Sequence, residues 1–125
     1  MPGPGSFMWN ELSSKDLDAS KKFFGEVAGW TFEEVDMGTG TYTIVKSGDD
    51  QVAGMMPTQD PNQPTAWVSY IHVADVDAAA AKVEGAGGNI IVPMMDVPNV
   101  GRFCWIQDPA GGVVALMTPA QTPES

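Results

Sequence analysis

Apolar and polar side chains alternate over residues 7–13, which predicts a first strand with Trp9, Glu11 and Ser13 on one face. A helix is expected next, because Asp16 can accept the free N–H groups of a first turn and Gly29 can end the helix in a left-handed conformation. The spacing predicts that the buried side of this helix consists of Leu17, Ser20, Phe24 and Val27. The remaining strands of this half are expected at residues 31–35, 42–47 and 51–56.

The second half of the chain repeats this order. Asp16-Leu17-Asp18-Ala19 matches Asp75-Val76-Asp77-Ala78, because 75 − 16 gives an offset of 59, and residues 44–57 match 106–119 at an offset of 62. The helix after Asp75 is expected to end at Gly87-Gly88. Its buried side is predicted to be Val76, Ala79, Ala80 and Val83, and the strands of this half are expected at residues 67–73, 89–92, 102–107 and 113–117.

The repeat therefore predicts an α+β fold, with two tandem βαβββ units forming a curved mixed sheet and helices on its outer face. The 125 residues are expected to form a single domain. Within it, repeat one covers about residues 7–57, a polar linker about 58–65 and repeat two about 66–119.

The composition and charge of the chain argue against several classes of function. Sixteen acidic and six basic residues give a net charge of −10, which argues against a nucleic-acid partner. No apolar run approaches the roughly 18 residues of a membrane span, and residues 1–5 lack the basic and apolar regions of a signal peptide. The single cysteine, Cys104, is expected to be a small core residue facing the helix, and its solitary state favours a cytoplasmic location.

Several phrases of the sequence occur in positions typical of one family. They are Asp16-Leu17-Asp18-Ala19-Ser20, Gly29-Trp30-Thr31-Phe32, Val52-Ala53-Gly54-Met55, Asp75-Val76-Asp77-Ala78, Gly101-Arg102-Phe103 and Asp108-Pro109-Ala110-Gly111. With these phrases the chain resembles the vicinal oxygen chelate superfamily of glyoxalases, ring-cleaving dioxygenases and bleomycin-resistance proteins. It is most similar to the actinobacterial-antigen branch of glyoxalase-like proteins.

The resemblance implies a divalent metal ion held by a histidine seven residues before each capping aspartate and by a glutamate on the last strand of a unit. Transferred to this chain, those positions are Trp9 and Val68 on the first strands, and Ala53 and Ala115 on the last strands. None of these side chains offers a lone pair to a metal, so we predict no metal and no other cofactor.

The faces that carry these positions predict a cleft for a small molecule, because aromatic and methionine side chains suit such a pocket. The ligand-binding candidates are Trp9, Met55, Tyr70, Phe103, Trp105, Gln107 and Met117. The predicted function is a glyoxalase- or bleomycin-resistance-like protein that binds a small apolar or aromatic molecule without the usual metal. A competing interpretation is that these side chains fill the sheet as ordinary core, which would leave a structural or interaction module.

A second hypothesis is a glyoxalase-like lyase or isomerase, with or without an unconventional divalent metal. It would use Glu11 and the single histidine, His72, as catalytic groups, since a carboxylate and an imidazole can exchange protons at neutral pH. A histidine that is simply hydrogen-bonded at the sheet surface is the alternative. The expected partners are a small-molecule ligand and a second copy of the chain in a homodimer, because closed two-fold dimers are the commonest oligomers.

Overall fold

The computed structural model describes residues 3–36, 41–58, 61–97 and 100–120. The chain divides into two compact units: Trp9–Val68 forms one, and residues 1–8 with 69–125 form the other. Below they are called the first unit and the second unit, and each is described by itself. Within the described part, neither helix has the length and apolar character that crossing a membrane requires.

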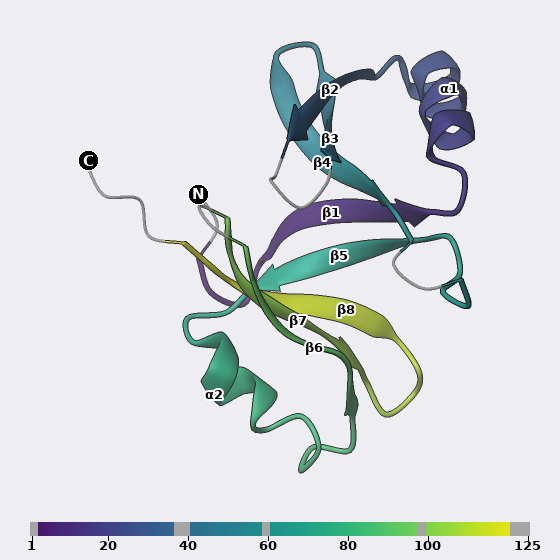
Figure 1. The fold of residues 1–125 in the computed structure, drawn as a ribbon. Coiled ribbons are helices and arrows are strands. Elements are labelled where there is room, and N and C mark those ends of the chain that lie inside the picture. The colour runs from purple at the N-terminus through teal and green to yellow at the C-terminus, as the bar shows by residue number, and fades with distance from the viewer. Residues whose placement is uncertain (1–2, 37–40, 59–60, 98–99, 121–125) are drawn as a thin grey trace. The chain divides into compact units, whose positions relative to one another are not determined.

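The first unit has the predicted order of strand, helix and three strands. Its elements are β1 (Phe7–Ser14), α1 (Leu17–Ala28), β2 (Thr31–Asp36), β3 (Thr41–Ser47) and β4 (Asp50–Pro57). The strands lie in the order β2-β3-β4-β1, with β3 antiparallel to both β2 and β4, and β1 parallel to β4 (Figure 1). Leu12, Val45, Ala53 and Met55 form the buried core, against which Leu17 and Phe24 of α1 pack.

The ends of α1 follow the sequence closely, whereas its buried side does not. The Asp16 carboxylate accepts the N–H of Ala19 at 3.1 Å, and Gly29 takes the left-handed conformation with φ 72°, so both predicted caps are confirmed. No residue of α1 is fully buried, and Val27 is 67% exposed, which makes the predicted burial of Val27 wrong. The helix contacts the core through Leu17 and the large ring of Phe24, and Val27 lies beyond that contact.

The second unit repeats the order with a shorter helix. Its elements are the end of β5 (Ala66–His72), α2 (Val76–Ala80), β6 (Asn89–Val97), β7 (Gly101–Gln107) and β8 (Val113–Pro119), in the strand order β5-β8-β7-β6, and the start of β5 up to Val68 belongs to the first unit. Here β8 is parallel to β5, and β7 is antiparallel to both β8 and β6. The unit also includes the start of the chain, because the Gly5 N–H donates to the His72 carbonyl and the His72 N–H donates to the Ser6 carbonyl. The sequence did not predict this pairing.

Helix α2 begins as predicted and ends early. The Asp75 carboxylate accepts the N–H of Ala78 at 3.1 Å, but the helix covers only Val76–Ala80, and residues 81–87 form turns. Glycines at 85, 87 and 88 weaken helix propensity there, so the expected continuation to Gly87 is wrong. The buried side is nevertheless confirmed, because Val76 and Ala80 pack with Leu116 and the fully buried Cys104.

Strand register decides which side chains share a face, because residues directly opposite one another in neighbouring strands point to the same side. In the first unit Leu12 is opposite Met55, and Val45 is opposite Ala53, so all four lie on the side that α1 covers. The expectation that Ala53 and Met55 share the face of Trp9 and Glu11 is therefore wrong.

On the other face of the first unit, Glu11 is opposite Gly54, and in the second unit Tyr70 is opposite Ala115. Gly54 thus matches Ala115, and since 115 − 54 is 61, the later strands repeat at an offset of 61 and not 62. The two hairpins explain the error, because β3 and β4 have an irregularity between Val45 and Lys46 and a shorter connection than β7 and β8.

Candidate functional site

The metal positions of the resembled family are held by side chains that cannot bind a metal. After correction of the register they are Trp9, Val68, Gly54 and Ala115, and none supplies a nitrogen, oxygen or sulfur lone pair to a cation. Among the described residues, no group of three or more His, Cys, Asp and Glu side chains could hold an ion. The donor set of this chain does not fit the family's divalent metal.

A chain of hydrogen bonds crosses the face of the first unit that lies opposite α1. The Trp9 indole N–H donates to the Tyr42 hydroxyl at 3.1 Å, and that hydroxyl donates to the Glu11 carboxylate at 2.9 Å. Glu11 is only 6% exposed, so these bonds compensate part of the cost of burying its polar atoms. Trp9 and Glu11 thus lie on one face as predicted, and they meet through a third residue that was not predicted.

Tyr42 takes this position because Gly54 has no side chain. A Cβ atom at Gly54 would overlap the hydroxyl and the ring of Tyr42, so the tyrosine lies across the strand where the family carries its metal-binding carboxylate. The signal that could have found Tyr42 is a glycine in the interior of β4, since such a glycine often marks the close approach of another group. A tyrosine hydroxyl therefore stands in this position in place of a metal ligand.

The corresponding face of the second unit is aromatic, and the sequence predicted its residues correctly. One row across the strands holds Tyr70, Ala115 and Trp105, and the next row holds His72, Met117 and Phe103. The Tyr70 and Phe103 rings lie 5.7 Å apart. Tyr70 and Ala115 are almost fully buried, whereas Phe103, Trp105 and His72 are half-buried.

Gln107 and Trp105 of this face differ in whether their polar groups form hydrogen bonds. Gln107, at the end of β7, donates from Nε2 to the Gly111 carbonyl at 3.3 Å, and so it is tied to the β7–β8 turn. The Trp105 indole N–H is buried and has no hydrogen-bond partner among the residues that the structure describes. An unpaired buried donor costs about 1–3 kcal/mol, so this N–H is a group that a bound molecule could satisfy.

Glu11 and His72, the predicted catalytic pair, lie in different units. Glu11 is placed by β1 among Trp9 and Tyr42, and His72 is held through its backbone by Gly5 and Ser6 at the end of β5. Their pairing in an acid–base step therefore remains a prediction.

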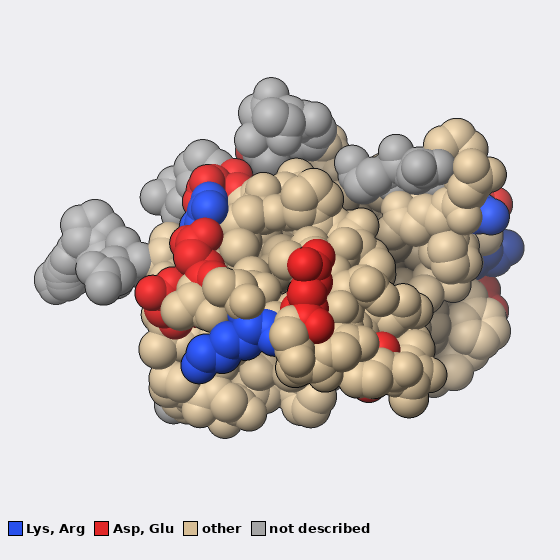
Figure 2. Space-filling model, turned by 90° about the horizontal axis from the view of Figure 1, so that it is seen from below, with Lys and Arg blue, Asp and Glu red and all other residues tan. Residues whose placement is uncertain are grey.

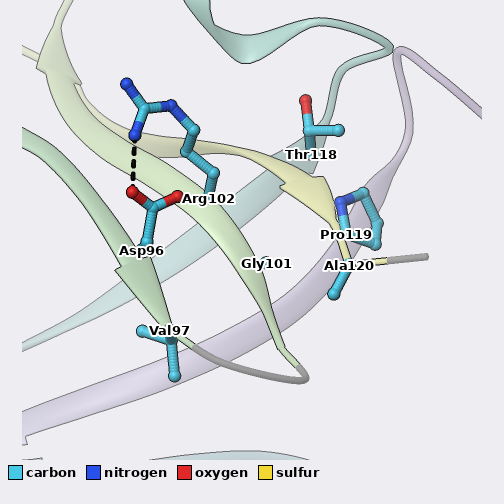
Figure 3. Close-up of a pocket in the computed structure, with 7 residues that line it drawn as sticks. All are labelled: Asp96, Val97, Gly101, Arg102, Thr118, Pro119 and Ala120. Carbon is cyan, nitrogen blue, oxygen red and sulfur yellow. Dashed lines mark hydrogen bonds and ion pairs between the residues drawn. The ribbon is translucent and has the colours of Figure 1, made fainter. Parts of the chain in front are cut away.

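A shallow hollow lies at the ends of β6, β7 and β8, and its polar groups are already engaged (Figure 3). Arg102 donates to Asp77 at 2.9 Å and to Asp96 at 2.7 Å, and this pairing lowers the pKa of Asp77 mainly through the hydrogen bond from Arg102. The Thr118 hydroxyl accepts the N–H of Val76 and donates to the Val73 carbonyl. These contacts secure the strand ends and leave little for a ligand, so we do not place the site there.

Charged side chains do not mark a separate binding surface on the face that Figure 2 shows. Basic side chains lie among acidic ones in its described part, and no isolated basic patch is visible. Beyond the Arg102 pairs, Lys21 pairs with Glu34 at 2.7 Å and Lys46 lies 3.8 Å from Glu33. The functional candidates are therefore the two sheet faces opposite the helices.

Two βαβββ units with caps at matching positions, and sheet faces that carry aromatic side chains, define a glyoxalase-like class of small domain. The chain belongs to the Glyoxalase/Bleomycin resistance protein/Dioxygenase superfamily, whose family model matches residues 7–116. This membership confirms the resemblance and the α+β fold inferred from the sequence.

Curated relatives and solved structures agree with this membership. The chain is 38% identical over 117 residues to a Mycobacterium tuberculosis protein named "Putative glyoxylase CFP32", covering 93% of this chain and 45% of that protein. It is 35% identical to the "Anthracycline biosynthesis protein DnrV" of Streptomyces peucetius, covering 90% and 46% respectively. The chain thus spans about half the length of the curated relatives it matches.

A solved structure supports the fold alone. Methylmalonyl-CoA epimerase from Mycobacterium tuberculosis superposes with a TM-score of 0.62 at 15% identity, over 92% of this chain and 88% of that one.

Proposed function

We propose that this protein binds a small, planar aromatic molecule on the sheet faces opposite its helices, and that it does so without a divalent metal ion. The observation that carries the proposal is that the four positions of the family's metal ligands hold Trp9, Val68, Gly54 and Ala115, while Tyr42 lies over Gly54 and Tyr70 and Trp105 lie opposite Ala115. The family's means of polarising an oxygen-bearing substrate is thereby replaced by surfaces suited to stacking.

The second unit supplies the apolar part of the proposed site. Phe103 and Trp105 are half-buried beside the small side chain of Ala115, so their rings can contribute contact area to a flat ligand. Met117 lies in the row of Phe103, and its flexible thioether can adapt to ligands of different outline. The name of the relative DnrV supports this choice of ligand class, since anthracyclines are fused-ring aromatic compounds.

Binding of planar probes to the purified protein tests the proposal. We expect fluorenone, measured by equilibrium dialysis, to bind equally well before and after treatment with EDTA. Phe103→Ala should weaken binding about tenfold, because the loss of a ring contact costs on the order of 1.4 kcal/mol. The matched control is Val100→Ala, which truncates a side chain of the same unit that is 42% exposed and should leave affinity unchanged. Stoichiometric metal by elemental analysis, with binding lost in EDTA, would overturn the proposal.

One observation favours the lyase or isomerase alternative. The buried Glu11 carboxylate accepts a hydrogen bond from the Tyr42 hydroxyl, with 2.9 Å between the two oxygens, and such a pair can exchange protons with a substrate. The corresponding test follows the exchange of the methyl protons of acetophenone in D2O by NMR. Protein-dependent exchange that disappears in Glu11→Gln and in His72→Ala would establish this function, and its absence in the unmodified protein would refute it for this class of proton transfer.

We also propose a homodimer. Phe23 and Val27 of α1 and the nearby Trp67 are 57%, 67% and 40% exposed, and Phe24 makes edge contacts with the rings of both Phe23 and Trp67. Clustered exposed apolar side chains of this kind often mark contacts with another protein chain. Light scattering should give twice the monomer mass of 13.2 kDa, and Phe23→Glu should reduce it to one monomer. A monomeric mass for the unmodified protein would refute the dimer.

A further inference from the structure

The indole N–H of Trp105 is a buried hydrogen-bond donor of the second unit for which the described residues provide no acceptor. Trp105 lies on β7, its Nε1 atom is buried, and no described residue accepts its hydrogen. An indole N–H can only donate, so a second donor or an apolar side chain cannot satisfy it.

The residues around Trp105 favour a flat occupant. Ala115 lies directly opposite on β8 and is the smallest side chain of its row, with Tyr70 on its far side. Phe103, two residues before Trp105 on the same strand face, completes the aromatic surroundings. Gln107, the amide on this face nearest in the sequence, is bonded to the β7–β8 turn instead. A molecule that both stacks on rings and accepts a hydrogen bond would match these groups.

We infer that the Trp105 N–H is the specificity-determining donor of the ligand site, and that the ligand class is a planar aromatic compound with a carbonyl or quinone oxygen. This inference rests on the proposed binding function and adds the chemistry of the group recognised. The ring supplies contact area against Phe103, and the oxygen in the ring plane accepts the indole hydrogen. A ligand that presents only donors in that position leaves two donors facing each other, so it binds less tightly.

Two probes with the same carbon frame separate the acceptor from the ring. Fluorenone carries a carbonyl, and fluorene has a methylene group in its place. For the unmodified protein we expect fluorenone to bind about tenfold more tightly than fluorene in equilibrium dialysis. In Trp105→Phe, which keeps an aromatic ring and removes the N–H, this difference should vanish while the affinity for fluorene is retained. The control Trp67→Phe, which changes an exposed tryptophan of the first unit, should keep the tenfold difference.

The possible outcomes distinguish this inference from the function on which it rests. If neither probe binds the unmodified protein, the proposed aromatic-binding function fails for this class. If both bind equally, that function stands and the donor role of Trp105 is overturned, as expected if a water molecule is the acceptor. If Trp105→Phe still binds fluorenone more tightly than fluorene, another group recognises the carbonyl and the inference is likewise overturned.

A spectroscopic measurement tests the same contact in the unmodified protein, in case Trp105→Phe does not fold. The four tryptophans give four indole N–H resonances in a ¹⁵N-labelled sample. One of these should move downfield on addition of fluorenone and stay in place with fluorene, and magnetisation transfer from Phe103 should identify it as Trp105. A downfield shift of a different tryptophan, or of none, would contradict the inference.

Discussion

The two units share one plan and differ in how they use the face opposite the helix. In the first unit the position of a family metal ligand is Gly54, and Tyr42 lies across it and joins Trp9 to Glu11 by hydrogen bonds. In the second unit the matching position is Ala115, and no described residue accepts the N–H of the neighbouring Trp105. On the face of the first unit, Trp9, Tyr42 and Glu11 hydrogen-bond to one another. On the face of the second unit, the Trp105 N–H remains available beside aromatic side chains. The two units therefore share one backbone plan, and a few side chains determine the chemistry of each face.

The helices of the two units also differ, in how deeply their side chains are buried. The 12-residue α1 has no fully buried residue and is held by half-buried Leu17 and the ring of Phe24, which stacks on Trp30 at 5.4 Å. The 5-residue α2 buries Val76 and Ala80 against Cys104. The shorter helix is thus the one more firmly packed, because burial depends on the shape of the contact and not on helix length.

The largest expected effect comes from exchanging the small residues at the matched position. Gly54→Ala should destabilise the protein by about 3 kcal/mol, because a Cβ atom forces Tyr42 away from the buried Glu11 and removes a hydrogen bond. The reverse change in the second unit, Ala115→Gly, should cost only about 1 kcal/mol, through backbone entropy and a lost methyl group. Urea unfolding of both variants measures the difference.

A double-mutant cycle tests the cause. In a Tyr42→Ala background, Gly54→Ala should cost less than about 1 kcal/mol, since the ring that it displaces has been removed. An undiminished cost in that background would show that Tyr42 is not the reason for the glycine.

The next largest effect separates the helices. Val76→Ala should lower the free energy of unfolding by about 2 kcal/mol, because Val76 is 2% exposed and the change leaves a cavity beside Cys104. Val27→Ala in α1 should change it by less than about 0.5 kcal/mol, because that side chain is 67% exposed. Equal losses in the two variants would contradict the difference in packing between the helices.

The sequence predicted those features of the fold that local spacing determines. The βαβββ order, the caps at Asp16 and Asp75 and the left-handed Gly29 all depend on a few neighbouring residues. The buried side of α2 and the position of Cys104 followed from the same periodicity. Each of these features is set within one or two helical turns or within a single strand, where the periods of 3.6 and 2 apply directly.

The sequence could not predict features that depend on the pairing of distant strands. A shift of one residue moves every side chain of a strand to the opposite face, so the irregularity between Val45 and Lys46 was enough to misplace Ala53 and Met55. Tyr42 was missed for the same reason, because its position over Gly54 follows from the register of β3 and β4. The face of the second unit was predicted correctly because its hairpin contains no such irregularity.

A smaller effect is expected on the helix-covered side of the two sheets. Thr43 matches Cys104, since 104 − 43 is again 61, and both are buried. The Thr43 hydroxyl finds no hydrogen-bond partner in the described part of the chain, so Thr43→Val should stabilise the protein by about 1 kcal/mol. Cys104→Ser should do the reverse, because it introduces a hydroxyl among Val76, Ala80 and Leu116. Thermal unfolding of the two variants checks the opposite signs, and a destabilised Thr43→Val would show that its hydroxyl is satisfied by water.

The smallest effect concerns the turn that lengthens the second hairpin. The Asp108 carboxylate accepts the N–H groups of Gly112 and Ala110, and these hydrogen bonds hold its pKa below the usual value. Because the folded pKa is the lower one, the contribution of Asp108 is complete above the unfolded pKa near 3.8 and disappears as the pH falls through the folded pKa. Asp108→Asn should therefore melt slightly below the unmodified protein at pH 7, and the two melting temperatures should converge in acid. A difference in melting temperature that persists at pH 2 would mean that the Asp108 side chain acts through its shape. The charge of its carboxylate would then not stabilise the longer hairpin.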